Sequence, residues 1–189
     1  DHAATKGELD ERKADLAQMR AKLQALEAQL SIRQDTAPAV DEIPDALDKL
    51  PDWIPSLQPR VVIVEKAVRV AARTEHREVE KIYRGLRALA TDYWASRFEG
   101  DEDAYARWTE FLKESRMRWG PVGVANDIGR YQGEYQAVWE GRTYTMTHHL
   151  QGSNSRDPTR CIRIYAAIDE ERRLIVIGAL PAHLTNTMT

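Results

Sequence analysis

Hydrophobic residues near the N-terminus repeat with the spacing of a coiled coil. Leucine or methionine recurs at successive spacings of 7, 3, 4, 3 and 4 residues, at Leu9, Leu16, Met19, Leu23, Leu26 and Leu30. This spacing places one apolar stripe along a helix whose other faces are polar. It predicts a coiled-coil arm over residues 1–34, which joins copies of the chain or a partner protein through residues 9–30. The alternative is a single amphipathic helix folded against the body of the protein; the uniformly polar faces favour the coiled coil.

Residues 35–59 form an acidic segment marked by prolines, which we interpret as a linker. Proline cannot continue a helix and disfavours helix in its predecessor, so the predicted arm ends near Asp35. A flexible acidic tether, or a mimic of nucleic acid that covers a basic site, is one possibility. We favour a connector docked on the body, because tryptophan and aliphatic side chains prefer burial. The side chains in question are Ile43, Leu47, Leu50, Trp53 and Ile54.

Apolar residues at helical spacing predict helices between residues 60 and 120. Val61–Val64 is either a short strand or the start of a helix that reaches about Thr74. A second helix is expected from Glu78 to Phe98, with Gly100 after its end, and a third from Asp101 to a stop at Gly120. We expect their aromatic residues to form a core rather than a stacking platform for bases. Residues 120–133 are glycine-rich but lack the Gly-Lys-Ser/Thr of a phosphate-binding loop, so we expect a surface loop there.

The periodicity changes from helical to alternating at Glu134, which predicts a sheet. We expect a four-stranded antiparallel meander with strands near residues 134–140, 143–150, 160–168 and 172–179. Glu140-Gly141 is a hairpin turn signal between the first two strands. The predicted fold class is α+β: an N-terminal coiled-coil helix, a helical layer and a C-terminal antiparallel β-sheet, the last two in one domain over residues 60–189.

Composition removes several classes of protein. The 189 residues carry 27 Lys and Arg against 30 Asp and Glu, for a net charge of −3, which disfavours a uniformly basic nucleic-acid binder. The single cysteine, Cys161, excludes a disulfide framework and favours the reducing cytoplasm. We expect no membrane span, since the aliphatic runs are only four residues long. We also expect the chain to be part of a longer protein, because it opens at Asp1 without methionine.

The charge is unevenly distributed along the chain. Residues 142–189 contain six arginines and no lysine and have a net charge of +2, whereas the remainder of the chain has −5. Three of the five histidines, His148, His149 and His183, lie in the same segment. A localised anion-binding site is therefore compatible with the acidic average.

A short motif in the same segment resembles the C-terminal half of the RelE/ParE toxin superfamily. The similarity covers about residues 142–185 and rests on Leu150-Gln-Gly152, Cys161-Ile-Arg163-Ile-Tyr165-Ala-Ala-Ile-Asp169, Arg173-Leu-Ile-Val-Ile-Gly178 and His183-Leu184. The resemblance implies helices packed on a curved antiparallel sheet. Several members cut messenger RNA in the ribosome, and others bind DNA gyrase or act only as partners of an antitoxin. It points to Arg163 and Tyr165 on the sheet and to His183 after the last strand.

Cleavage of RNA without a metal requires a base for the 2′-OH proton, an acid for the leaving oxygen and a cation for the phosphate. Histidine serves as acid or base, and the planar guanidinium of arginine suits phosphate. Our candidate catalytic residues are His149, His183, Arg163 and Tyr165, and our candidate RNA-binding residues are Arg156, Arg160, Arg172 and Arg173. We predict no cofactor and no metal site, because adjacent histidines on a strand face opposite sides. One of the pair His148 and His149 should be packed, and Cys161 should be a buried thiol.

The leading hypothesis is a RelE-like bacterial effector that binds or cleaves RNA, or acts on the ribosome, within a larger coiled-coil protein or complex. The alternative is a non-catalytic module for oligomerisation and protein interaction whose sheet is a docking surface. Arg163 could then simply pair with Glu134 or Asp169.

Overall fold

The computed structural model describes residues 12, 15, 16, 19, 20, 22, 43–122, 133–153, 155 and 157–185. The chain divides into two compact units, Asp1–Val40 and Asp41–Thr189. The described residues of the first unit are helical, and Leu16 and Met19 of the predicted seam are 51% and 56% exposed. The rest of the seam, at Leu9, Leu23, Leu26 and Leu30, lies outside the described residues.

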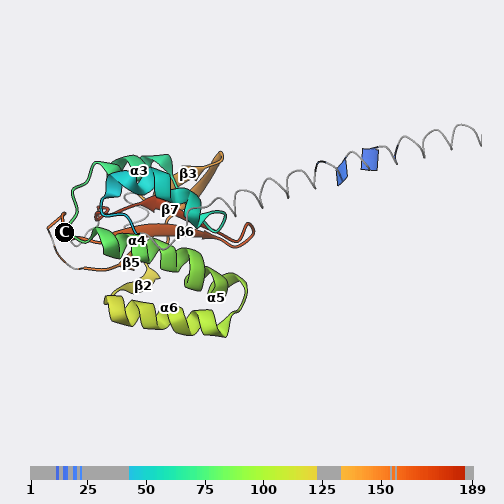
Figure 1. The fold of residues 1–189 in the computed structure, drawn as a ribbon. Coiled ribbons are helices and arrows are strands. Elements are labelled where there is room, and N and C mark those ends of the chain that lie inside the picture. Colours follow the sequence, from blue (N-terminus) through green and yellow to red (C-terminus); the bar gives the residue numbers. More distant parts are fainter. Residues whose placement is uncertain are drawn as a thin grey trace, which may run out of the picture. The chain divides into compact units, whose positions relative to one another are not determined.

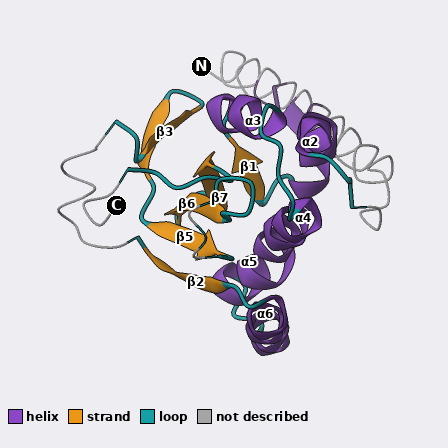
Figure 2. Ribbon diagram, turned by 90° about the vertical axis from the view of Figure 1, so that its left-hand side faces the viewer, coloured by secondary structure: helices purple, strands orange, loops and turns teal. Residues whose placement is uncertain are grey.

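The second unit is an α+β structure built on a five-stranded mixed sheet (Figures 1 and 2). The strand order is β1 (Val61–Ile63), β7 (Leu174–Ala179), β6 (Arg163–Asp169), β5 (His148–Gln151) and β2 (Arg118–Pro121). β1 is parallel to β7, and the other pairs are antiparallel. β3 (Gln136–Trp139) and β4 (Arg142–Thr145) form a separate two-stranded hairpin.

The three antiparallel pairings of the predicted meander are confirmed, but its strands do not form one continuous sheet, and β1 and β2 were not expected in it. The expected strand 143–150 is interrupted, because the N–H of Met146 donates to Tyr135 whereas that of Thr147 donates to Ala166 on β6. Gly120 and Pro121, expected in a surface loop, end strand β2 at the sheet edge, where proline costs no ladder hydrogen bond. The turn at Glu140-Gly141 is confirmed, with both residues at positive φ.

The helices follow the predicted pattern more closely. After β1 comes α3 (Glu65–Ala72), so Val61–Ile63 is strand and not helix, and Val64 precedes the first turn of α3. The predicted helix 78–98 is confirmed as α4 (Val79–Ala88), a π-helical turn η3 (Leu89–Tyr93) and α5 (Trp94–Phe98). Gly100 has a φ of +70°, and the Asp101 carboxylate accepts the N–H of Ala104 at 2.9 Å to start α6 (Glu102–Ser115). Helix α6 turns back beneath α4 and α5 (Figure 1).

The proline-marked segment is docked on the body over its described part. It forms three short helices, η1 (Leu47–Lys49), α2 (Leu50–Trp53) and η2 (Ile54–Leu57). Leu47, Leu50 and Leu57 are buried, and Trp53 meets Tyr83 of α4 edge-on with ring centroids 4.8 Å apart. The docked alternative for this segment is therefore the one observed.

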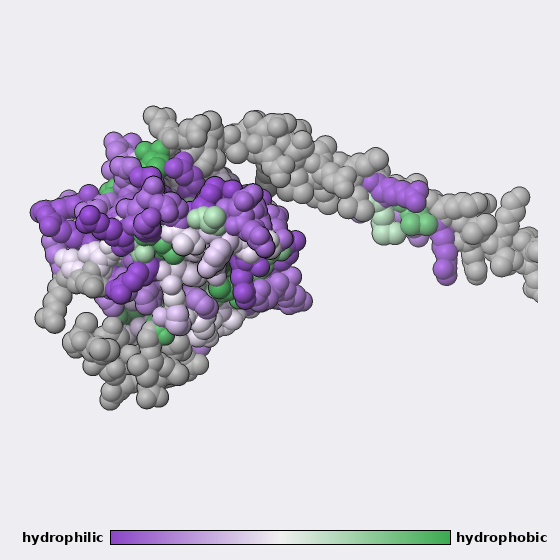
Figure 3. Space-filling view, turned by 90° about the horizontal axis from the view of Figure 1, so that it is seen from below, coloured by the Kyte–Doolittle hydropathy of each residue, from purple (hydrophilic) through white to green (hydrophobic). Residues whose placement is uncertain are grey.

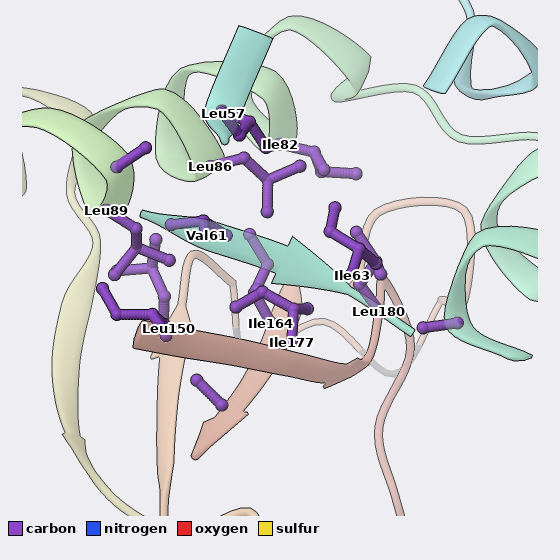
Figure 4. Packing of buried hydrophobic residues seen from close by; sticks show 14 of the residues in the cluster. Leu57, Val61, Ile63, Ile82, Leu86, Leu89, Leu150, Ile164, Ile177 and Leu180 are labelled. Atoms are coloured by element: carbon purple, nitrogen blue, oxygen red, sulfur yellow. The ribbon is translucent and has the colours of Figure 1, made fainter. Parts of the chain in front are cut away.

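Helices α2, α4 and α5 lie along one face of the sheet, where the main core forms (Figures 2 and 4). Leu86 and Leu89 of the helical layer pack with Leu150 and Ile164 of the sheet. Gly85 permits this approach, because a Cβ there would come within 2.9 Å of Leu150 Cδ2. Within the described residues, no helix is both long and apolar enough to cross a membrane.

Candidate functional site

Strand register places polar side chains in two rows on one face of the sheet. Residues opposite each other on neighbouring strands share a face, as do residues two apart on one strand. The pairing of β2 with β5 and of β5 with β6 therefore aligns side chains across all three strands. The first row is Arg118, Gln151 and Arg163, and the second is Gly120, His149 and Tyr165. This face is opposite the one on which Leu150 and Ile164 pack under α4.

Three residues from separate segments meet on this face, and we call them the His–Tyr cluster: His149, Tyr165 and His183. The rings of His149 and Tyr165 are 5.7 Å apart in an edge-on arrangement. The Tyr165 hydroxyl is 3.4 Å from Nδ1 of His183 and accepts the N–H of Leu184 at 3.2 Å. Tyr165 is buried, while His149 is half-buried and His183 exposed, so the two imidazoles form the outer part of the cluster.

The adjacent histidines face opposite sides of the sheet, as predicted. His148 lies on the helical side and stacks on Trp119, with centroids 5.5 Å apart and planes 19° apart. His149 lies on the side of Tyr165. Only His149 is therefore available to the His–Tyr cluster.

Burial and the positive charge of Arg163 shift the pKa values of the residues in the His–Tyr cluster. Burial lowers the pKa of His149; a hydrogen bond to Gln151 opposes this, and the charge of Arg163 adds to it. Burial and Arg163 likewise lower the pKa of His183, whereas burial raises the pKa of Tyr165. These directions favour the neutral imidazoles and the protonated phenol at neutral pH. The cluster thus offers two potential bases and one proton donor.

His149 also has an unused hydrogen-bonding atom. Its Nε2 lies 3.3 Å from the side-chain oxygen of Gln151; in the tautomer that donates to this oxygen, the lone pair is on Nδ1. That Nδ1 is buried and has no hydrogen-bond partner among the residues the structure describes. An unsatisfied buried acceptor is costly, and because this atom is buried it is not accessible to a substrate in this conformation.

Arg163 is placed differently from the expectation of a phosphate ligand. It is 5% exposed, and its guanidinium donates to the carbonyl oxygens of Ser153 and, at 2.9 Å, Ile162. Its backbone N–H donates to Pro181 at 2.7 Å. Arg163 therefore anchors the loop before β6 and supplies positive charge to both histidines.

Arg118 also lies on this face of the sheet, although the sequence analysis did not name it as a candidate site residue. It is exposed and stands in the same row as Arg163. It was missed because β2 was not predicted. The alternation of buried Met117 with exposed Arg118 is the signal that could have revealed it.

The predicted RNA-binding arginines are dispersed. Arg156 lies outside the described residues, and Arg160 is exposed in the loop before β6. Arg172 pairs with Glu140 at 2.8 Å, and Arg173 donates to the carbonyl of Phe98 and lies over the ring of Trp94. Both arginines come after Asp169, at the far end of β6. Asp169 is four residues from Tyr165 along the strand, which corresponds to about 13 Å. The structure thus brings the four candidate catalytic residues together and places Arg172 and Arg173 at the opposite end of the sheet.

Other chemistry has less support in the described part of the chain. There, no group of three or more His, Cys, Asp or Glu side chains is arranged to hold a metal ion. Cys161 is buried, as predicted, and its carbonyl lies 2.9 Å from Nε2 of His76.

Comparisons with family models, curated proteins and solved structures found no match to this chain. Its function is therefore inferred from the chemistry of the site and from the resemblance in its sequence.

Proposed function

We propose that the chain is a RelE-like effector module that binds RNA and cleaves it without a metal at the His–Tyr cluster. The observation that supports this proposal is the convergence of His149, Tyr165 and His183 beside two arginines, Arg118 and Arg163. These are the residue types that transesterification of RNA requires, and they come from four separate segments. The module would belong to a larger coiled-coil protein or complex, with the ribosome as a possible site of action.

In this proposal a neutral imidazole accepts the proton of a ribose 2′-OH, and the 2′ oxygen attacks the adjacent phosphorus. His183 suits this step because its side chain is exposed and because burial and the charge of Arg163 lower its pKa, whereas Nδ1 of His149 is buried. The 5′ oxygen leaves and takes a proton from the phenol of Tyr165, which keeps its proton because burial raises its pKa. The bond broken is P–O5′, and the products are a 2′,3′-cyclic phosphate and a 5′-hydroxyl. Arg118 stabilises the charge on the phosphorane.

The test is cleavage of labelled RNA by the full chain in the presence of a chelator, with and without ribosomes. We expect cleavage, and a loss of about 10²-fold or more in His183→Gln, which removes a proton acceptor at an exposed position. His76→Gln is the matched control, since it makes the same change at a histidine outside the His–Tyr cluster, and it should cleave normally. Absence of cleavage in both conditions, together with normal growth when the protein is induced in bacteria, would rule the nuclease out.

A second candidate function is self-association through residues 9–30. Its specific support is the exposure of Leu16 and Met19, two seam positions on a helical segment. Apolar side chains at such spacing are normally covered by a partner helix. Self-association is compatible with the nuclease proposal. The number of chains in the oligomer would then determine how many active sites it contains.

A further inference from the structure

An aromatic groove of 540 Å³ lies on the helical side of the sheet, away from the His–Tyr cluster. Its lining comes from η3, α5, α6 and β2 and includes Tyr93, Arg97, Tyr105, Trp108, Leu112 and Trp119. This volume lies within the range of about 300–1,000 Å³ typical of small-molecule sites. Figure 3, which views the molecule from below, shows a pale, weakly polar area between strongly hydrophilic residues.

The rings in the aromatic groove are held firmly but not fully covered. Tyr93 packs against Trp119 at 4.9 Å and against Trp108 at 5.2 Å, tilted in both cases. Tyr93 and Trp119 are half-buried, and Tyr105 on α6 is 63% exposed. The π-helical turn η3 ends at Tyr93, and such turns recur at functional sites. The groove thus presents rigid aromatic surface to a flat ligand.

Guanidinium groups lie in the aromatic groove and near its edge. Arg97 lines it, with Glu170 as its partner. Arg116 is exposed one turn beyond Leu112, at the end of α6, and Arg118, at the start of β2, faces the other side of the sheet. Aromatic rings beside guanidinium groups are the combination that binds single-stranded nucleic acid, in which bases stack and phosphates pair with cations.

Strand β2 connects the aromatic groove to the His–Tyr cluster. It is an edge strand, and its successive residues Arg118 and Trp119 point to opposite faces. Trp119 lines the groove, while Arg118 lies in the row beside His149. A strand that crosses this edge can place a base in the groove and its backbone at the cluster.

We infer that the aromatic groove binds an unstacked base of the single-stranded RNA that the His–Tyr cluster contacts. This inference rests on the proposed function and adds its substrate class: the RNA must be single-stranded beside the cleaved bond. Double-stranded RNA keeps its bases stacked and paired and cannot supply one to the groove.

The test measures binding of the full chain to a labelled 2′-O-methyl strand of about ten nucleotides, which cannot be cleaved because its nucleophile is blocked. A strand with the same backbone but no bases is the comparison. We expect the base-containing strand to bind roughly ten-fold more tightly and to quench tryptophan fluorescence, since Trp108 and Trp119 line the groove. Tyr105→Ala and the groove-filling Thr109→Trp should each remove this difference.

Val138→Ala is the matched control, because Val138 is 62% exposed on the hairpin, away from the groove. It should bind as the wild type does. Equal binding of both strands by the wild type, or unchanged base dependence in both groove variants, would overturn the inference. Cleavage of unmodified RNA would then still support the proposed function. Base-dependent quenching without cleavage of unmodified RNA would support base binding in the groove and contradict the nuclease. If neither strand binds, both the groove inference and the proposed function are refuted.

Discussion

His149 makes the stability of the protein depend on pH. Its pKa is lowered from the ordinary value of 6.5, chiefly by burial, and the pKa values of His148 and His183 are lowered as well. Below about pH 6.5 the unfolded chain therefore binds more protons than the folded protein does. The resulting stability is present above this pH and is lost as the pH falls toward the lowered values.

We accordingly expect the free energy of unfolding to decrease between about pH 7.5 and about pH 5.5, above the range in which carboxylates titrate. His149→Gln keeps a polar side chain but removes one of the three titrating groups, so its decrease should be smaller. Urea denaturation at several pH values measures both slopes. Parallel slopes for the two proteins would show that His149 titrates in the folded state as it does in the unfolded chain.

For Arg163, the sequence predicted the face of the sheet on which it lies but not its hydrogen-bond partners. The resemblance in the sequence placed it on the sheet face with Tyr165, and it lies there. Its guanidinium, however, donates to two backbone carbonyls, because a buried charge needs hydrogen-bond partners close by. Ser153 is ten residues away in the chain, and periodicity contains no information on a loop that folds back in this way.

At the scale of elements, the hairpin β3–β4 approaches the sheet closely at Gly178 of β7. A Cβ on Gly178 would come within 2.8 Å of the Ala137 Cβ and would also collide with the Met146 sulfur. Gly178→Ala should therefore lower the free energy of unfolding by roughly 1–3 kcal/mol, as overpacking does. Gly120→Ala is the control: its Cβ would meet no described atom within 4 Å, so we expect a change within about 0.5 kcal/mol. Chemical denaturation of both variants checks this, and equal stabilities would mean that the hairpin shifts freely.

Elements with local signals could be predicted from the sequence, and those defined by distant partners could not. Gly100, Asp101 and the Glu140-Gly141 turn mark helix and strand ends through their own backbone preferences, and each was predicted. β1 pairs in parallel with β7, more than a hundred residues later in the chain, and local periodicity does not report such a pairing. β2 was hidden by Gly120 and Pro121, which normally indicate a loop.

At the scale of the whole molecule, the structure refines the charge asymmetry seen in the sequence. At the β6–β7 turn, Arg142 pairs with Glu171, and Arg172 with Glu140. These pairs neutralise the turn locally. At the other end of the sheet, Arg118 and Arg163 place positive charge beside the His–Tyr cluster. Net charge per segment was compatible with a localised basic site, whereas the positions of these arginines depend on how the strands pair.

The oligomeric state is the property of the whole chain that the exposed seam predicts. Leu16 and Met19 occupy adjacent seam positions and are each more than half exposed in a single chain. Covering a leucine contributes about 2–3 kcal/mol per side chain, so a seam that pairs with a second copy favours association.

We expect the full chain to be a dimer or larger by light scattering, and residues 35–189 to be monomeric. Leu16→Glu should dissociate the full chain, because it places two carboxylates in the seam. Gln18→Glu introduces the same charge on the outer face of the predicted heptad and should leave the mass unchanged. A monomeric mass for the full chain would assign the seam to an intramolecular contact or to a different partner protein.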